Sequence, residues 1–139
     1  MFGHDIIYTH AANRGAPIGR AAERDFLSFV SSVENLEGGV YLSVGSAVMS
    51  PMIFEKSLSM SRNVLRQRGE DIRDCHIHVV DLQASTWDWS EGEPPMDNPA
   101  YYLRFMKTFN RMGCPTDYSC ADNRAFFVSL YRALDALDR

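Results

Sequence analysis

The sequence predicts a small α/β domain with three layers, in which helices cover a Rossmann-like, mostly parallel sheet of three or four strands. Short β-branched segments alternate along the chain with longer segments whose apolar residues recur every three or four positions. This alternation is typical of parallel strands joined by crossover helices. A length of 139 residues, with 45% hydrophobic and 23% charged residues, fits one α/β domain over residues 1–139.

The N-terminal part of the chain is expected to supply a strand, a loop and a helix. Residues 5–10 are short and rich in β-branched side chains, which favours a strand. Residues 11–19 contain the glycine and proline that are typical of a loop. Over residues 20–36 the apolar side chains follow helical spacing, and the glycines at 38 and 39 end that helix.

The middle of the chain predicts two further strands around a second helix. Residues 40–44 form an apolar strand segment that ends in a turn of small residues. Ser50 and Pro51 mark the start of a helix that we expect to continue to about Arg68. Residues 75–82 are apolar enough to lie in the middle of a sheet.

The last third of the chain begins with a long loop. Residues 83–99 show no periodicity, and loops of this length are usually functional or mobile. Helical spacing returns over residues 100–112, and residues 116–120 are expected to form a short fourth strand. A final helix then begins at Asp122 or Asn123.

Charge and composition exclude several classes of partner. The net charge is −4, whereas a dedicated nucleic-acid binder normally carries a basic surplus. No apolar run approaches the roughly 20 residues that cross a bilayer, and no secretory signal is present, so we expect no membrane partner. Cys75, Cys114 and Cys120 are scattered and odd in number, which predicts no disulfide framework and a cytoplasmic location.

Candidate ligand-binding residues follow three of the predicted strands. Ligands of open parallel sheets bind beyond the carboxyl ends of the strands, so these residues should meet at one edge. Small residues let the backbone approach a ligand. The free N–H groups at the start of a helix favour binding of an anion. An arginine side chain can bind a phosphate bidentately. The candidates are Asn13, Arg14, Gly45, Ser46, Asp81, Ser85 and Thr86.

Simpler explanations stay open for the same residues. Gly45 and Ser46 also suit a tight turn that binds nothing. Arg14 also suits a solvated surface position, and Asp81 suits the cap of a turn. No catalytic constellation is recognisable, so the sequence assigns no reaction.

Two other groups of residues suggest sites of a different kind. His76 and His78 share one strand face, but a closed metal site needs four ligands, so we expect no metal. Trp87 and Trp89 lie in the long loop, where exposed tryptophans often mark a partner surface; the alternative is that they fold back onto the core. The aromatic residues expected in the core of the next helix are Tyr101, Tyr102, Phe105 and Phe109.

One stretch of sequence carries a family resemblance. Residues 37–51 (Glu-Gly-Gly-Val-Tyr-Leu-Ser-Val-Gly-Ser-Ala-Val-Met-Ser-Pro), followed by residues 54–58, resemble a group of poorly characterised bacterial proteins with a deoxyhypusine-synthase-like NAD-binding fold. The resemblance covers about residues 5–82 and implies a dinucleotide site, for a cofactor such as NAD, at Gly45 and Ser46. The lysine of that family's Trp-Gly-Lys motif has no counterpart here, so synthase activity is not implied.

Two functions are therefore predicted from the sequence. The first is binding of a nucleotide or sugar phosphate at the carboxyl edge of the sheet, with no reaction assigned. The alternative is a non-catalytic interaction or oligomerisation module that uses the loop with Trp87 and Trp89. Because the predicted sheet is thin, we expect the chain to be either one lobe of a larger fold or a domain that completes its core as a homo-oligomer.

Overall fold

The structure is a computed structural model that describes residues 5–137. Its elements in chain order are a 3-10 helix η1 (Asp5–Thr9), α1 (Gly15–Glu34), β1 (Val40–Val44), α2 (Met49–Arg66), β2 (His76–Asp81), short 3-10 helices η2 (Trp89–Glu91) and η3 (Pro99–Tyr102), α3 (Arg104–Asn110), β3 (Thr116–Cys120) and α4 (Asn123–Leu137).

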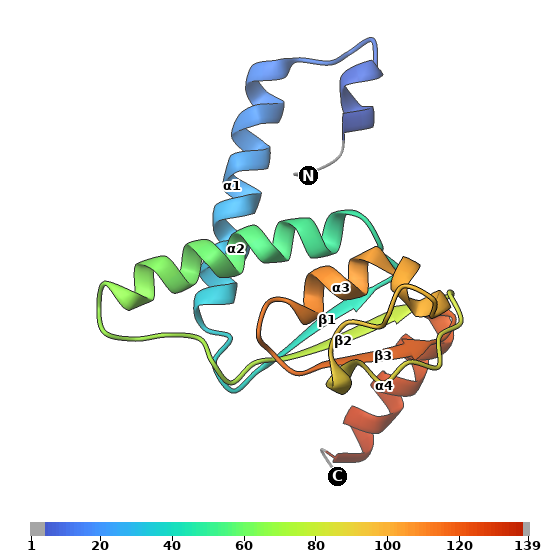
Figure 1. The fold of residues 1–139 in the computed structure, drawn as a ribbon. Coiled ribbons are helices and arrows are strands. Elements are labelled where there is room, and N and C mark those ends of the chain that lie inside the picture. Colours follow the sequence, from blue (N-terminus) through green and yellow to red (C-terminus); the bar gives the residue numbers. More distant parts are fainter. Residues whose placement is uncertain (1–4, 138–139) are drawn as a thin grey trace.

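The three strands form one parallel sheet in the order β1-β2-β3, which confirms the predicted α/β class. Helices α2 and α3 lie on one face of this sheet and α4 lies on the other, so the fold has three layers (Figure 1). The central strand β2 is apolar as predicted, and its Ile77, Val79 and Val80 are buried. No helix among residues 5–137 has the length and apolar character needed to span a membrane.

The core lies between the sheet and the layer of α2 and α3. Phe54 and Leu58 lie one helical turn apart on α2 and are fully or almost fully buried. The ring of Tyr41 on β1 stacks on Phe54 with 3.8 Å between ring centroids, and Phe109 on α3 lies beside both rings. These contacts attach both upper helices to the sheet.

The N-terminal segment differs from the prediction. Asp5–Thr9 is a 3-10 helix rather than a strand, and α1 begins at Gly15, inside the expected loop. Ile6 and Tyr8 of η1 are exposed, with 74% for Ile6, and Ile7 is only half-buried, so their pattern does not reflect burial in a sheet. Most of α1 extends away from the sheet, and only its last turns pack against α2 (Figure 1).

The segment expected as one helix over residues 100–112 is divided. A 3-10 helix ends at Tyr102, and α3 begins at Arg104 with a changed direction of the backbone at Leu103. The prediction of a core position is confirmed for Phe105 and Phe109 but is wrong for Tyr102, which is 69% exposed. Pro99 at the first position of η3 suits a helix start and explains where this segment begins.

The scattered cysteines predicted no disulfide framework, but the structure contains one disulfide. Cys75 and Cys114 are bonded, with 5.6 Å between their Cα atoms, and Cys120 is free and exposed. Because Ile77 pairs with Thr116 in the parallel ladder, the residues two positions earlier, Cys75 and Cys114, which lie just before β2 and β3, are also side by side. Disulfides are rare in the cytosol, so the basis for predicting a cytoplasmic location is removed.

Candidate functional site

The carboxyl edge of the sheet brings Gly45 and Ser46 to the start of α2, as predicted. Gly45 has φ +65°, and its N–H donates to the carbonyl oxygen of Val80 at 2.9 Å. The Ser46 hydroxyl accepts a hydrogen bond from the N–H of Ser50 at 3.2 Å. Both residues therefore build the turn between β1 and α2.

The space above Gly45 is already filled by the first residue of α4. An ideal Cβ placed on Gly45 would lie 2.2 Å from Nδ2 of Asn123 and 3.0 Å from its Cγ. Glycine is required here both for the positive φ and for this close approach. In a dinucleotide-binding fold the phosphates would occupy the place that the Asn123 amide takes here.

Two of the other candidates at this edge, Asp81 and Ser85, also have structural partners. Asp81 at the end of β2 accepts hydrogen bonds from the N–H groups of Leu82 and Gln83 at 2.8 and 3.3 Å, so it caps a turn. The hydroxyl of Ser85 accepts from the N–H of Trp87 at 3.4 Å, and Thr86 is exposed.

Asn13 and Arg14 do not join this edge, and that prediction is wrong. They lie at the start of α1, at the end of the helix that is remote from the sheet (Figure 1). Nη1 of Arg14 donates to the carbonyl oxygen of Asn13 at 2.9 Å, and the Asn13 amide donates to the carbonyl oxygen of Tyr8 at 3.4 Å. The expected first strand, which would have placed them at the edge, does not exist.

The two tryptophans fold back onto the core. Trp89 is only 3% exposed and belongs to the hydrophobic core. Trp87 is partly buried against the same core, and its Nε1 donates to the carbonyl oxygen of Gly92 at 2.9 Å. The expectation of an exposed tryptophan surface is wrong for Trp89, and the alternative of folding back is confirmed.

The histidines of β2 pair with β3 and do not form a metal site. Nε2 of His76 lies 2.5 Å from a carboxylate oxygen of Asp117, and Nε2 of His78 lies 3.1 Å from the hydroxyl of Ser119. Within residues 5–137 no three His, Cys, Asp or Glu side chains lie close enough together to hold a metal ion.

A hollow that the sequence did not predict lies on the outer side of α3. It has a volume of about 360 Å³, and we call it the tyrosine–arginine groove. Its lining residues are Tyr101, Tyr102, Arg104, Lys107, Thr108 and Arg111.

Glu93 positions two of the three cations in this groove. Nζ of Lys107 lies 3.3 Å from one carboxylate oxygen of Glu93, and Nη2 of Arg111 lies 2.8 Å from the other. The hydrogen bond from Arg111 holds the pKa of Glu93 below its usual range, so this carboxylate stays charged. The Lys107 ammonium also lies 3.4 Å from the ring centroid of Tyr101, a cation–π contact.

Two groups in the groove remain available to a ligand. Tyr102 is 69% exposed, and its ring meets Tyr101 edge to face at a centroid distance of 5.6 Å. The guanidinium of Arg104 has no hydrogen-bond or ion-pair partner within the described part of the chain. An exposed ring beside an unpaired cation can bind a planar group that carries a negative charge.

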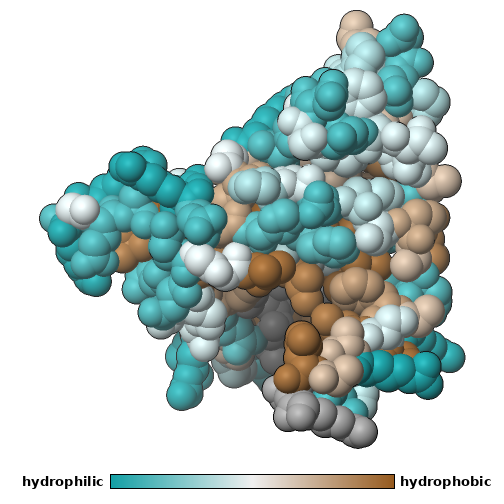
Figure 2. All heavy atoms as spheres, turned by 90° about the horizontal axis from the view of Figure 1, so that it is seen from below, coloured by the Kyte–Doolittle hydropathy of each residue, from teal (hydrophilic) through white to brown (hydrophobic). Residues whose placement is uncertain are grey.

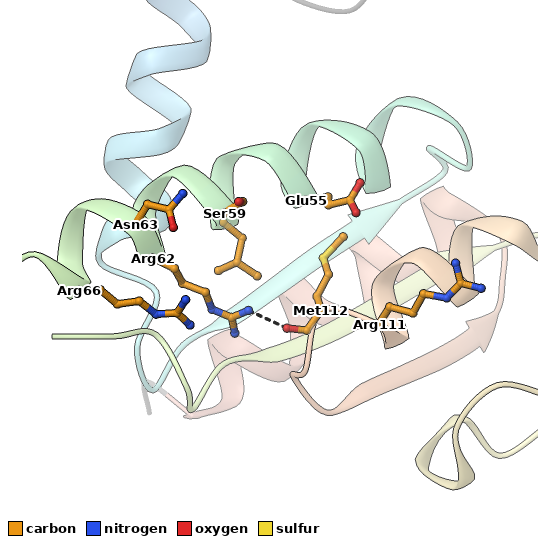
Figure 3. A pocket seen from close by; sticks show the side chains of 8 residues that line it. Glu55, Ser59, Arg62, Asn63, Arg66, Arg111 and Met112 are labelled. Carbon is orange, nitrogen blue, oxygen red and sulfur yellow. Dashed lines mark hydrogen bonds between the residues drawn. The ribbon is translucent and has the colours of Figure 1, made fainter.

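A second hollow of about 300 Å³ continues from Arg111 along α2 (Figure 3). Arg62 and Arg66 on α2 line it at one end, and Arg111, directly after α3, lines it at the other end, with Met112 between them. The charged residues around both hollows are the cations Arg62, Arg66, Arg104, Lys107 and Arg111 and the carboxylates Glu55, Asp71 and Glu93. They carry a net charge of +2 on a chain whose net charge is −4.

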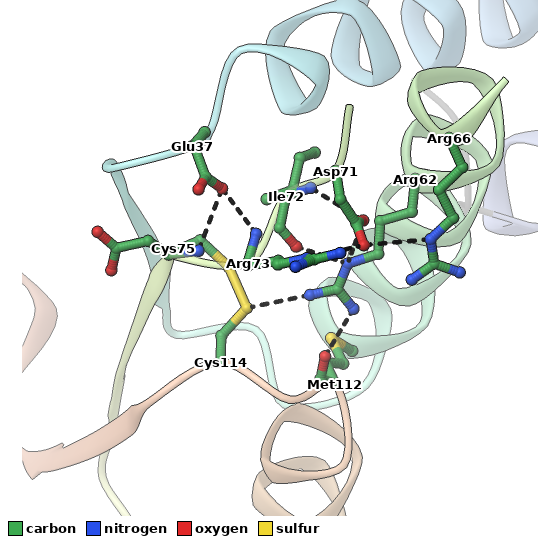
Figure 4. A network of polar contacts seen from close by, with 10 residues as sticks. Glu37, Arg62, Arg66, Asp71, Ile72, Arg73, Cys75, Met112 and Cys114 are labelled. Carbon is green, nitrogen blue, oxygen red and sulfur yellow. Dashed lines mark hydrogen bonds and ion pairs between the residues drawn. A yellow bond between two sulfur atoms is a disulfide. The ribbon is translucent and has the colours of Figure 1, made fainter. Parts of the chain in front are cut away.

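Arg62 is held in a polar network and is not free for a ligand (Figure 4). Its Nε donates to the carbonyl oxygen of Ile72 at 2.9 Å, and its Nη1 donates to the carbonyl oxygen of Met112 at 2.7 Å. Its Nη2 also lies 3.6 Å from Sγ of Cys114, so this arginine joins α2 to the disulfide.

One sequence signal could have indicated the tyrosine–arginine groove. Arg104, Lys107 and Arg111 follow a spacing of three and four residues, which places three cations on one helix face. The same spacing of the aromatic residues suggested a single core helix, and this concealed the break at Leu103 that leaves Tyr102 exposed.

Comparison of the chain with protein-family models, with curated proteins and with solved structures finds no significant match. The resemblance to the deoxyhypusine-synthase-like fold therefore stays a prediction.

Proposed function

We propose that the chain binds a small phosphate-containing ligand, a nucleotide or a sugar phosphate, in the tyrosine–arginine groove. The observation that carries this proposal is that Arg104, Lys107 and Arg111 line the same hollow as an exposed tyrosine ring. The proposal keeps the ligand class predicted from the sequence but moves the site from the carboxyl edge to the outer side of α3.

Each side chain has a separate role in this proposal. Arg104, whose guanidinium is unpaired among residues 5–137, binds phosphate oxygens, because a guanidinium group matches phosphate bidentately, and Arg111, which is held by Glu93, adds positive charge beside it. Lys107 is anchored between Glu93 and the ring of Tyr101 and adds a fixed positive charge. The exposed ring of Tyr102 stacks on the base of a nucleotide.

The dimensions of the groove favour a small ligand. Its volume of about 360 Å³ lies at the lower end of the range for ligand sites, which begins near 300 Å³. A mononucleotide or sugar phosphate fits this range better than a dinucleotide does. The carboxyl edge is less favourable, because the Asn123 amide occupies the space next to Gly45.

Calorimetric titration tests the proposal with four probes: inorganic phosphate, ribose 5-phosphate, AMP and NAD. We expect saturable heat with AMP, and weaker binding of the two probes that lack a base. Arg104→Gln should weaken binding of AMP about tenfold or more, because it removes the charged hydrogen-bond donor that is unpaired in the described part of the chain, and Arg111→Gln should weaken it less, because Arg111 is paired with Glu93. Arg24→Gln on α1 is the matched control, because Arg24 is exposed and lines neither of these hollows.

A second variant separates phosphate binding from base stacking. Tyr102→Ala should weaken AMP about tenfold and leave ribose 5-phosphate unchanged, since only the base meets the ring. Absence of saturable heat with all four probes contradicts the proposal. An equal loss of binding in Arg24→Gln also contradicts it, because the cations of the groove would then have no special role.

A further inference from the structure

Helix α4 makes few contacts with the body of the protein. None of its 15 residues, Asn123–Leu137, is buried. Its main contact with the sheet is the ring of Phe126, which stacks on His78 with 6.0 Å between ring centroids. Every residue of α4 from Tyr131 to its end at Leu137 is exposed, although isolated helices of this length are marginal in water.

The outer side of α4 carries an apolar stripe with the spacing of a coiled coil. Phe127, Tyr131 and Leu134 follow one another at intervals of four and three residues and are 54%, 70% and 53% exposed. We call these three residues the α4 seam. Val128 and Leu137 flank the seam and are also exposed.

The apolar surface continues onto the lower face of the sheet. Two helices, α2 and α3, cover the upper face of the sheet. In the described part of the chain a single helix, α4, covers the lower face (Figure 1). Val40 and Leu42 on β1 are therefore 59% and 40% exposed. Viewed from below, apolar side chains gather across the middle of this side of the molecule (Figure 2).

The charge on α4 favours a second copy of the same chain as the occupant. Its side chains include Arg124 near the start and Arg132 and Asp135 near the end, so the seam runs through a nearly neutral surface. In an antiparallel pair the Arg124 end of one helix lies beside the Asp135 end of the other, and the two helix dipoles oppose each other favourably.

The exposed area is on the scale that a dimer needs. Full burial of an aromatic side chain removes about 150–250 Å² from water, so the exposed parts of Phe127 and Tyr131 offer about 250 Å² per copy. A standard interface buries about 800 Å² per partner. The aliphatic residues that extend this surface are Val40, Leu42, Val128, Leu134 and Leu137.

We propose that two copies of the chain form a two-fold symmetric dimer through their α4 seams. The helices pack antiparallel, so that Phe127 of each copy faces Tyr131 of the other. In this arrangement the α4 of one copy also lies over the open part of the other copy's sheet at Val40 and Leu42. Each sheet is then covered by two helices on its upper face, α2 and α3, and by two on its lower face, its own α4 and that of the other copy.

Light scattering of the full chain tests this proposal in a Cys120→Ser background, which excludes dimers linked through the exposed thiol. We expect a mass of about twice 15.8 kDa that falls toward 15.8 kDa on dilution. Tyr131→Lys with Leu134→Lys should give the monomer mass at every concentration, and both positions are exposed, so the fold is retained. The control is Met96→Lys, at an apolar position that is 71% exposed outside α4, and it should stay dimeric.

Two results overturn the proposal. One is a wild-type chain that keeps the monomer mass at about 1 mM, in which case the α4 seam is covered by something other than a second copy. The other is a dimer that persists in the Tyr131→Lys, Leu134→Lys variant.

Cross-linking tests the direction of the helices. Disulfides form only when Cα atoms lie within about 7 Å. In the Cys120→Ser background, an antiparallel pair therefore predicts a covalent dimer from the double variant Phe127→Cys, Tyr131→Cys and none from Tyr131→Cys alone. A covalent dimer from Tyr131→Cys alone would indicate a parallel pair and overturn the proposed arrangement.

Discussion

The guanidinium of Arg62 donates a 2.7 Å hydrogen bond to the carbonyl oxygen of Met112, which lies 50 residues further along the chain. The same side chain donates to the carbonyl oxygen of Ile72. These bonds hold the segment before β2 and the segment before β3 against α2. The network is next to the Cys75–Cys114 disulfide, so a covalent bond and a polar cluster stabilise the same end of the sheet (Figure 4).

We expect Arg62→Ala to lower the free energy of unfolding by about 2–4 kcal/mol, because it leaves two carbonyl oxygens without their donor. Arg62→Lys should not restore the loss, since one ammonium cannot reproduce the fixed spacing of the guanidinium N–H groups. Urea denaturation followed by circular dichroism measures the change. The control Arg66→Ala should cost less, because that side chain is 59% exposed; equal losses would refute the role of Arg62.

Loss of the disulfide should also destabilise the fold. The bond closes a segment with a sequence separation of 39 residues, for which about 3–4 kcal/mol is expected. We expect Cys75→Ala with Cys114→Ala to lower the urea midpoint accordingly, while Cys120→Ala has little effect because Cys120 is exposed. Mass spectrometry of the unreduced wild-type chain must show the bonded pair; two free thiols at these positions would contradict the structure.

Gly45→Ala should cost more than an alanine at other glycines with positive φ. Both Gly45 (φ +65°) and Gly113 (φ +76°) incur the backbone penalty of about 1–2 kcal/mol, but only at Gly45 does the new Cβ meet another side chain, that of Asn123. Adding Asn123→Ala should recover the stability that Gly45→Ala loses through the steric clash, but not the stability that it loses through the backbone conformation. Thermal unfolding of the single and double variants measures the coupling, and additive effects would exclude the contact.

Alkaline pH should destabilise the protein partly through Tyr118. Burial raises the pKa of Tyr118 to about 12, with additional contributions from the charges of Asp81 and Cys120. This pKa is raised above its value of about 10 in the unfolded chain. The contribution of Tyr118 to the free energy of unfolding is therefore fully present below pH 10 and is lost as the pH rises toward 12. Ultraviolet titration of wild type and Tyr118→Phe isolates this phenol, and ionisation near pH 10 would contradict the prediction.

Local sequence patterns were sufficient for the three strands and most of the helices. The strand segments at residues 40–44, 75–82 and 116–120 carry the apolar, β-branched composition that a sheet requires, and the structure confirms them within one residue at each end. For residues 5–10 the same composition was misleading. A strand also needs a neighbour with which to form hydrogen bonds, and composition does not say whether that neighbour exists.

The candidate site depended on contacts that no local pattern encodes. Gly45 and Ser46 were correctly placed at a turn by their residue types. That Asn123 fills the space above Gly45 follows from the packing of α4, almost 80 residues later. The burial of Trp89 and the exposure of Tyr102 likewise reverse what their positions in loop and helix patterns suggested.

The sequence was enough for the class of fold, because the periods of strands and helices are local properties of the backbone. The tertiary structure alone decided the Cys75–Cys114 bond, the tyrosine–arginine groove and the open side of α4. Each of these depends on which distant segments come together, and that is determined by the free energy of packing the whole chain.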